Sequence, residues 1–292
     1  MALYELIERP DLDEPVLVLA LDGWIDAGLS AVGAAAALTE ALETVTVARF
    51  STDELLDYRA RRPVVHLEDG AVRRLTWPEI ELRAAVDTDG NELLLLTGDE
   101  PDHLWHRFTD EVVTLALDLG VRLCVGMGAY PFAAPHTRPP RVASAASTDR
   151  LADRSLLRAS FEFAGGIQAA IEQECDHRGI PALGLWAQIP HYLPTKMPFP
   201  AGSLALLESL NAVTGLHLPV GDLPRRAEAI RERLDELIAQ NPEHVAMLHQ
   251  LEAAWDRSGP TAGPLVLTDL PTGDELVAEL EEFLRDQRPD GG

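Results

Sequence analysis

Lysine is almost absent from this chain of 292 residues, because Lys196 is the only lysine among its 24 basic residues. Lys196 stands in a proline-rich stretch, so a Gly-x-x-x-x-Gly-Lys-Ser/Thr phosphate loop is excluded. The sequence also lacks a Gly-x-Ser-x-Gly elbow, a His-Glu-x-x-His pair and a Gly-x-Gly-x-x-Gly turn after a strand. The common signatures of nucleotide binding and hydrolysis are therefore missing, which argues against an enzyme.

Cysteine and long apolar runs are also scarce. Cys124 lies in an apolar run and Cys175 on a predicted helix, a pattern that predicts two buried thiols in a reducing compartment. No apolar run approaches the roughly 18 residues of a membrane span. Glu5 and Glu8 stand where a secretory signal would carry basic residues. We therefore expect a cytoplasmic protein with no membrane partner.

Positive charge is half as abundant as negative charge. Lys and Arg number 24 and Asp and Glu number 48, so the formal net charge is 24 − 48 = −24. Nucleic-acid affinity depends on basic side chains that neutralise phosphates. The composition therefore argues against DNA and RNA as partners.

Strand and helix patterns alternate along most of the chain. Continuous apolar runs are typical of parallel strands that are buried on both faces. Such runs lead into helical patterns, which predicts an α/β fold with a mainly parallel sheet covered by helices on both faces. Antiparallel pairing is predicted only for 64–86, around a turn at 68–70. The predicted buried strands are 16–21, 44–50, 92–97, 121–127 and 180–189, with a short strand at 142–147, and the predicted helices are 27–43, 103–119 and 163–177.

The pattern changes after Pro219, where strands give way to helical spacing. Apolar residues recur on one helix face over 223–237, and Asn241 and Pro242 suit the first positions of a second helix. A linker and a final helix with the capping box Thr272-x-x-Glu275 follow. We predict an α/β domain at 1–218 and a helical extension at 219–292.

Ligands of open parallel sheets bind at the carboxyl ends of the strands. Four loops qualify for such a cleft, namely 22–28, 98–106, 126–138 and 190–198. No catalytic residue, cofactor or metal is predicted there. The candidate residues for a ligand or partner cleft are Gly23, Asp26, Gly28, Arg59, Gly98, Glu100, His136, Arg138, His191 and Tyr192.

Several of these candidates have a structural alternative. Gly23 and Gly28 bracket a turn that suits an anion, but Asp26 there can also cap the following helix. His136 and His191 follow strand ends and suit acid-base work, or they fix their loops by hydrogen bonds. Arg59 belongs to a predicted short charged helix at 53–63, which is either solvated or a docking rim.

A histidine pair at a helix start raises the question of a metal. Asp102-His103-x-x-His106 places two imidazoles three residues apart, a spacing that can bind a metal ion. No third His or Cys lies nearby in the sequence, and Asp is also expected in a first helical turn. A metal site is therefore not predicted.

A series of motifs resembles the proteasome assembly chaperone 2 family, in its bacterial, actinobacterial-type branch. No single motif is decisive, but their order and spacing over about 3–218 are specific. The motifs are Gly23-Trp-Ile-Asp-Ala-Gly28, the segment 50–63, Thr97-Gly-Asp-Glu-Pro101, Gly126-Met-Gly-Ala-Tyr-Pro131, Phe163-Ala-Gly-Gly-Ile-Gln168 and Ala187-Gln-Ile-Pro-His-Tyr-Leu193.

The resemblance implies a three-layer α/β/α sandwich of the phosphorylase/hydrolase-like kind that self-associates, with a trimer favoured. Relatives in archaea and eukaryotes help to assemble proteasome α subunits. We therefore expect a non-enzymatic assembly or interaction protein whose partners are itself and, as a candidate, proteasome subunits. Relatives that dock on the proteasome ring commonly end in hydrophobic-Tyr-x, whereas this chain ends in Pro289-Asp-Gly-Gly292, so that docking mode is not expected. The alternative function is a small-molecule binder or enzyme, a hydrolase or transferase, that uses a strand-end cleft.

Overall fold

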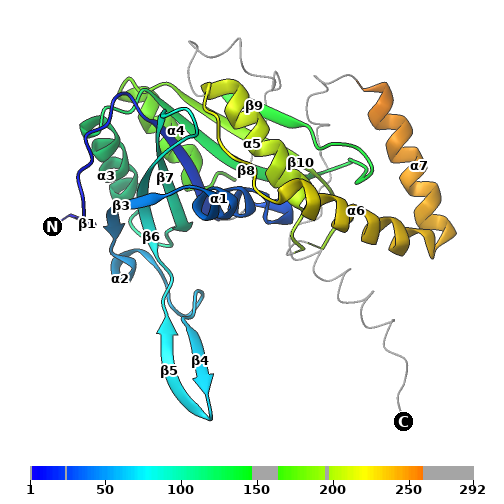
Figure 1. Cartoon of the computed structure of the whole chain (residues 1–292), viewed down its shortest axis with the longest axis horizontal. Coiled ribbons are helices and arrows are strands. Elements are labelled where there is room, and N and C mark those ends of the chain that lie inside the picture. The colour runs from blue at the N-terminus through cyan, green and yellow to red at the C-terminus, as the bar shows by residue number, and fades with distance from the viewer. Residues whose placement is uncertain (1, 24, 147–163, 195–196, 259–292) are drawn as a thin grey trace.

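A computed structural model describes residues 2–23, 25–146, 164–194 and 197–258. Eight strands form one mixed sheet, in which the central strands β7, β2, β8 and β10 run parallel and the flanking strands run antiparallel to their neighbours (Figure 1). In sheet order the strands are β1 (Tyr4–Leu6), β3 (Thr44–Phe50), β6 (Ile80–Val86), β7 (Glu92–Asp99), β2 (Val16–Asp22), β8 (Leu123–Phe132), β10 (Ala182–Pro190) and β9 (Val142–Ala146).

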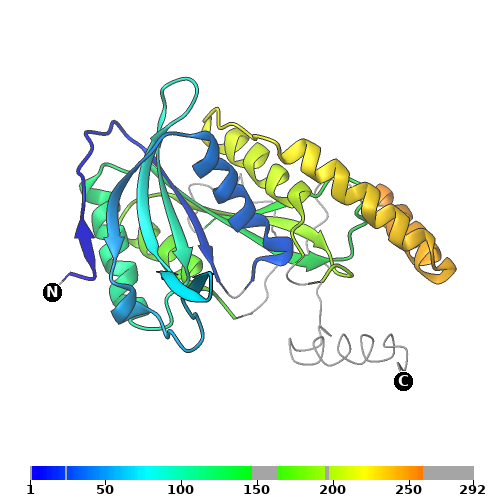
Figure 2. The same ribbon diagram turned by 60° about the horizontal axis from the view of Figure 1, so that its bottom comes forward.

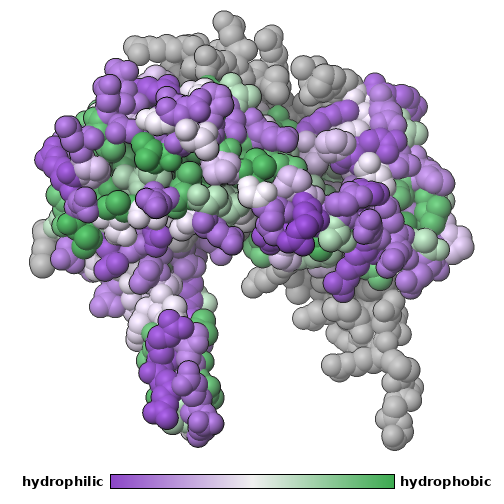
Figure 3. Space-filling model, viewed as in Figure 1, coloured by the Kyte–Doolittle hydropathy of each residue, from purple (hydrophilic) through white to green (hydrophobic). Residues whose placement is uncertain are grey.

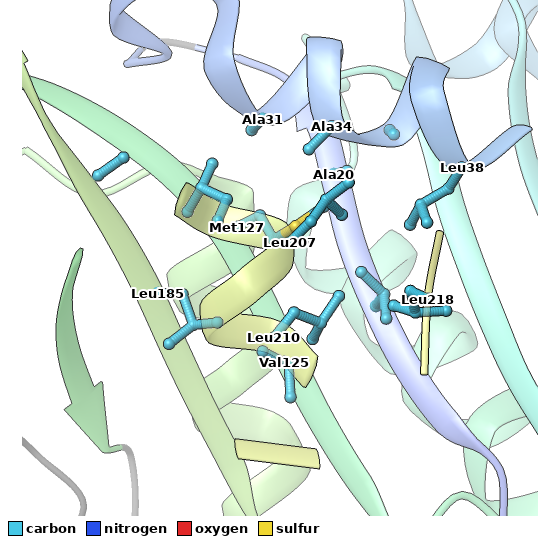
Figure 4. Packing of buried hydrophobic residues seen from close by; sticks show 14 of the residues in the cluster. Ala20, Ala31, Ala34, Leu38, Val125, Met127, Leu185, Leu207, Leu210 and Leu218 are labelled. Carbon is cyan, nitrogen blue, oxygen red and sulfur yellow. The ribbon is translucent and has the colours of Figure 1, made fainter. Parts of the chain in front are cut away.

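Helices α1 (Ser30–Ala41) and α5 (Pro200–Thr214) cover one face of the sheet. Figure 4 shows Ala31, Ala34 and Leu38 of α1 directed toward the sheet beside Leu207 and Leu210 of α5. The two helices pack closely because small residues separate them: a Cβ atom on Gly33 would lie 2.5 Å from the Ser203 hydroxyl. This face carries one of the two large apolar clusters of the protein.

Helices α3 (Trp105–Asp118) and α4 (Ile167–His177) cover the opposite face. Phe108 of α3 is fully buried there, and its ring centroid lies 4.9 Å from that of Phe50 on β3. Cys124 and Cys175 are both buried as free thiols in this cluster, as the sequence predicts. Helices on both faces confirm the α/β/α fold class (Figure 2).

A hairpin arm of two strands, β4 (Val64–Glu68) and β5 (Ala71–Thr76), projects from the sandwich (Figure 1). The strands pair antiparallel with each other and form a separate sheet. The antiparallel prediction for 64–86 is confirmed, although its last strand, β6, joins the main sheet.

Helices α6 (Leu223–Ala239) and α7 (Pro242–Arg257) form the predicted helical hairpin. The Asn241 side chain caps α7 by accepting a hydrogen bond from the Glu243 backbone N–H at 2.9 Å. Leu223 and Leu234 join the core beside α5, and Trp255 of α7 contacts Phe132. In the residues that the structure describes, no helix is both long and apolar enough to cross a bilayer.

The predicted mainly parallel sheet is mixed, because three of the pairings between its described strands are parallel and four are antiparallel, including those of β3 and β9. Local predictions also differ from the structure. The predicted helix 27–43 begins with a short 3-10 turn, Ala27–Leu29, because Gly28 and Leu29 have positive φ angles of 66° and 48°. Helix α2 covers only Thr52–Leu55, so the predicted helix over 53–63 is wrong beyond Leu55. Strand β8 continues to Phe132 instead of ending in a loop at 126–127, and α5 was not predicted. The predicted helix after Thr272 lies outside the described residues.

The packing on the α3 face can be tested by truncating Phe108. We expect Phe108→Ala to lower the free energy of unfolding by about 3–5 kcal/mol, because it leaves a cavity against Phe50. Leu117→Ala on the same helix is the control, since Leu117 is 40% exposed, and it should cost less than about 1 kcal/mol. Urea denaturation followed by circular dichroism measures both, and equal losses would contradict this assignment of the core.

Candidate functional site

A small cavity opens where the carboxyl ends of β2 and β8 meet the N-termini of α1 and α4. Its volume is about 60 Å³. The apolar residues that line it include Leu21, Ile25, Met127 of β8 and Trp186 of β10. The polar side chains that line the cavity among the described residues include those of Asp26, Glu100 and Gln168.

Asp26 caps helix α1 from the loop after β2. Its carboxylate accepts hydrogen bonds from the backbone N–H groups of Ala31 at 2.8 Å and Val32 at 3.0 Å. Burial raises the pKa of Asp26, while these two backbone hydrogen bonds lower it. The capping alternative for Asp26 is therefore realised, and the residue also lines the cavity.

Glu100 caps helix α4 from the loop after β7. Its Oε1 accepts a hydrogen bond of 2.5 Å from the Ile167 backbone N–H, and the residue is only 7% exposed. Glycines make room for this buried carboxylate, because a Cβ atom on Gly23 would lie 2.8 Å from Glu100 Oε2 and one on Gly166 would lie 3.0 Å from Oε1. Asp26 and Glu100, separate in sequence, thus line the same cavity.

A second buried carboxyl, Glu172, lies next to the cavity residue Gln168 on α4. Gln168 Nε2 donates a hydrogen bond of 2.8 Å to Glu172 Oε1. Gly126 and Gly184, paired in register on β8 and β10, leave the space that this pair fills. A Cβ atom on Gly126 would lie 2.2 Å from both Gln168 Nε2 and Glu172 Oε1. Burial raises the pKa of Glu172 from 4.5 to about 7.

Glu172 and Gln168 were not predicted from the sequence as site residues. One signal was available, because Gln168 and Glu172 are four residues apart on the helix face that also carries Ile171 and Cys175, both buried. Gly126 and Gly184 inside apolar strands were a second signal, since glycine within a strand marks a close approach of another group.

The histidine and tyrosine candidates are found away from the cavity. His136 is buried between the core and α6: its Nδ1 lies 2.7 Å from the Tyr192 hydroxyl and its Nε2 lies 3.1 Å from Asp235 Oδ1. Burial lowers the pKa of His136 and raises that of Tyr192 to about 12. His191 directly follows β10, and its backbone N–H donates a hydrogen bond to the Phe132 carbonyl at the end of β8.

Arg138 and its neighbours bind helix α7. Arg138 forms ion pairs with Asp256 at 2.8 Å and with Glu252 at 3.1 Å. The Arg141 guanidinium lies 3.9 Å from the centre of the Trp255 ring and donates a hydrogen bond to the Trp255 carbonyl at 2.8 Å. The loop over 136–141 therefore holds the helical extension against the core, and it does not share the cavity with Asp26 and Glu100.

The remaining candidates have separate positions. Gly98 has a φ of 121°, and a Cβ atom there would lie 2.0 Å from the Glu79 carbonyl, so it permits the close approach of β6. Gly28 supports the turn before α1, where a Cβ atom would meet Phe199 at 2.7 Å. Arg59 is exposed at the base of the hairpin arm. Within the described ranges no three His, Cys, Asp or Glu side chains are grouped to hold a metal ion, His103 and His106 included.

The buried state of Glu172 makes stability depend on pH. When folding raises the pKa of a carboxyl group, the group contributes its full stability at pH values below the pKa of the unfolded state. That contribution is lost as the pH rises through the pKa of the folded state. The shift from 4.5 to about 7 corresponds to about 3 kcal/mol. As the pH rises from 4.5 to 7.5, we expect the free energy of unfolding of Glu172→Gln to increase by that amount relative to the free energy of unfolding of the wild-type chain.

Urea denaturation at a series of pH values measures this difference, in which the titration of other groups cancels. Glu208→Gln is the matched control, because Glu208 is exposed on α5. A constant difference between the Glu172→Gln and wild-type proteins across the pH range would refute the buried, protonated carboxyl.

Comparison with known proteins identifies the family of this chain. The model of the PAC2 family matches residues 20–238. Three solved structures are similar to this chain. The Mycobacterium tuberculosis unknown function protein Rv2714 is 36% identical over 87% of this chain and 90% of its own length, with a TM-score of 0.81. A PAC2 family protein from Streptomyces avermitilis is 35% identical (TM-score 0.72) and the M. tuberculosis proteasome-assembly chaperone homologue Rv2125 is 32% identical (TM-score 0.73), each over 80% of this chain and 99% of its own length. No curated protein matches the chain. The match over most of its length confirms the resemblance seen in the motifs, and the chain belongs to the PAC2 family.

Proposed function

We propose that this protein is a self-associating, chaperone-like assembly protein whose hairpin arm is its main contact surface. The observation that carries the proposal is the exposure of the arm. Figure 3 shows apolar side chains along both edges of the projecting hairpin. The exposed apolar residues of the arm and its base are Val64, Val65, Leu67, Val72, Leu75 and Trp77, each between 43% and 64% exposed.

An uncovered arm of this kind is unfavourable in water. A two-stranded hairpin is marginally stable by itself, and among the described residues no third strand pairs with these two. A contiguous exposed apolar patch marks an interaction site. The base of the arm is stabilised by an edge-to-face contact between Tyr58 and Trp77, whose ring centroids are 4.9 Å apart. The arm is thus anchored to the core and lacks only a covering surface.

Charge favours a second copy of the chain as the covering surface. The range 59–77 contains five arginines and two acidic residues, which gives 5 − 2 = +3, while the rest of the chain carries −24 − 3 = −27. Electrostatic complementarity steers association toward partners of opposite charge. This positive excess comes from Arg59, Arg61 and Arg62 at the base, because the arm itself (64–76) has two arginines and two acidic residues. A basic base on an otherwise acidic chain supports homo-oligomers, for which a trimer remains our prediction.

Proteasome subunits are the proposed partner of the assembled protein. Rv2125, described as a proteasome-assembly chaperone homologue, is 32% identical over 80% of this chain. The absence of common catalytic motifs from the sequence is consistent with a role that needs binding surfaces and no chemistry.

Self-association can be tested on the arm. Leu67 and Val72 are directly opposite each other and are 64% and 62% exposed. We expect Leu67→Glu with Val72→Glu to convert the oligomer to a monomer in size-exclusion chromatography with light scattering, because it places charge in the buried interface. The control is Leu237→Glu, which alters an exposed leucine on α6 and should leave the oligomer unchanged. A wild-type monomer at micromolar concentration would contradict the proposal.

The proteasome role is tested separately by co-purification. The wild-type chain should capture proteasome subunits of its source cell, and the double arm variant should capture fewer because it cannot assemble. If neither captures subunits and a deletion strain assembles its proteasomes normally, the proteasome role is lost, whereas the light-scattering result still decides self-association.

The cavity favours a second candidate function, the binding of a small molecule. It lies at the carboxyl ends of parallel strands, where α/β folds bind ligands, and it combines apolar walls with a few polar groups. The alternative enzyme prediction, a hydrolase or transferase, would use the same cavity.

A further inference from the structure

We propose that the hairpin arm of one copy docks on the N-terminal edge of the next copy, a surface formed by residues 5–14 with Val45 of β3 and Val86 of β6. This inference rests on the proposed self-association and names the surface that receives the arm. It is argued from two exposed surfaces of the same chain that share apolar character and carry opposite charge.

The arm has one apolar face and one polar face. Apolar pairs alternate with a polar pair along its two strands, and a bulge at Arg73 keeps the apolar pairs on one face. The polar pair, His66 with Arg74, lies on the opposite face. One face of the arm can therefore be covered while the other stays in water. The apolar pairs are Val65 with Leu75 and Leu67 with Val72, each side chain between 43% and 64% exposed.

A second apolar surface lies at the N-terminal edge of the main sheet. β1 is the outermost strand, so no described strand pairs with its outer side. The register places Leu6, Val45 and Val86 on the α3 face of the three outermost strands, and Ile7 follows directly after β1. All four side chains are between 43% and 50% exposed. Exposed apolar side chains that share a face mark an interaction site.

The N-terminal edge carries negative charge that has no partner of opposite sign. Residues 5–14 contain five acidic residues and one arginine, and all five acids are exposed. Within the described residues none of these five acids forms an ion pair. The edge is thus able to receive a basic surface.

The base of the arm and its strand β5 supply that basic surface. Exposed arginines that form no ion pair with any described residue are Arg59, Arg62, Arg73 and Arg74. The acids of the arm, Glu68 and Asp69, are confined to its tip. Complementary charge steers two surfaces together and fixes their register. The charge and the apolar character of the two surfaces therefore select the same contact.

The contact joins two different surfaces of the same chain. The arm projects away from the sandwich, while β1 lies at the edge of the main sheet (Figure 1). Each copy then gives its arm to one neighbour and receives the arm of another, which is a heterologous interface. Such interfaces close into rings when the rotation between copies permits it. A ring is consistent with the trimer that we predict.

Charge reversal on each surface tests the contact, with light scattering of the full chain over a dilution series. Glu5→Arg with Glu8→Arg should raise the dissociation constant of the assembly about tenfold or more, because like charges then face each other. Arg73→Glu with Arg74→Glu should do the same from the side of the arm. All four substitutions in one chain bring opposite charges together again and should return the dissociation constant toward the wild-type value.

The control for net charge is Glu232→Arg with Glu236→Arg, two exposed positions on α6. It changes the net charge as much as the reversal of Glu5 and Glu8 and should leave the assembly unchanged. If the Glu5 and Glu8 variant assembles like the wild-type chain, or the fourfold variant assembles no better than either double variant, this contact is wrong while self-association stands. A monomeric wild-type chain would instead refute self-association, and this contact with it.

A mixing experiment distinguishes this contact from one between two arms. Leu67→Glu with Val72→Glu disables the arm and keeps the N-terminal edge, whereas Leu6→Glu with Ile7→Glu disables the edge and keeps the arm. Each variant alone should be monomeric. Their equimolar mixture should form dimers, because one intact arm can still meet one intact edge. A mixture that stays monomeric, or an edge variant that assembles like the wild-type chain, would overturn the proposal.

Discussion

Two carboxylates that cap helices, the half-buried Asp26 and the buried Glu100, organise the carboxyl edge of the sheet. Asp26 holds the N-terminus of α1 and Glu100 holds that of α4, each through backbone N–H groups that would otherwise lack partners. The cost of burying these acids is offset by the hydrogen bonds that they accept, and the glycines around Glu100 are needed to make room for it. The same two residues line the cavity, so the capping and ligand interpretations of Asp26 are compatible.

The pair of Glu172 and Gln168 explains features that otherwise look like defects in the sheet. Gly126 and Gly184 weaken their strands, because glycine has no side chain to pack. They face each other across β8 and β10, and the space between them is filled by polar atoms from α4. A buried acid with a pKa of about 7 is destabilising near neutral pH. Buried groups with perturbed pKa values cluster at functional sites, which supports a role for the cavity.

The sequence predicted most of the fold because apolar runs report strands buried on both faces. It failed where distant contacts decide the structure. Gly126 and Gly128 read as the start of a loop, yet they continue β8 because Glu172 and Trp186 fill their space. His136 and Arg138 read as cleft residues, but their partners Asp235, Glu252 and Asp256 lie 99 to 118 positions away in the chain. No local pattern shows such pairings, whereas Asp26 and Glu100 could be predicted because parallel strands end at one edge.

Under the proposed self-association, the hairpin arm links the physical state of the protein to its concentration. Within the described part of the chain, neither β4 nor β5 has a second neighbouring strand, so another surface would have to cover their backbone edges. In dilute solution the arm would expose an extended backbone. Proteases cleave such segments, and strands of other chains can pair with their exposed edges. Under that proposal, resistance of the arm to proteolysis would report how much of it is covered by a neighbouring chain.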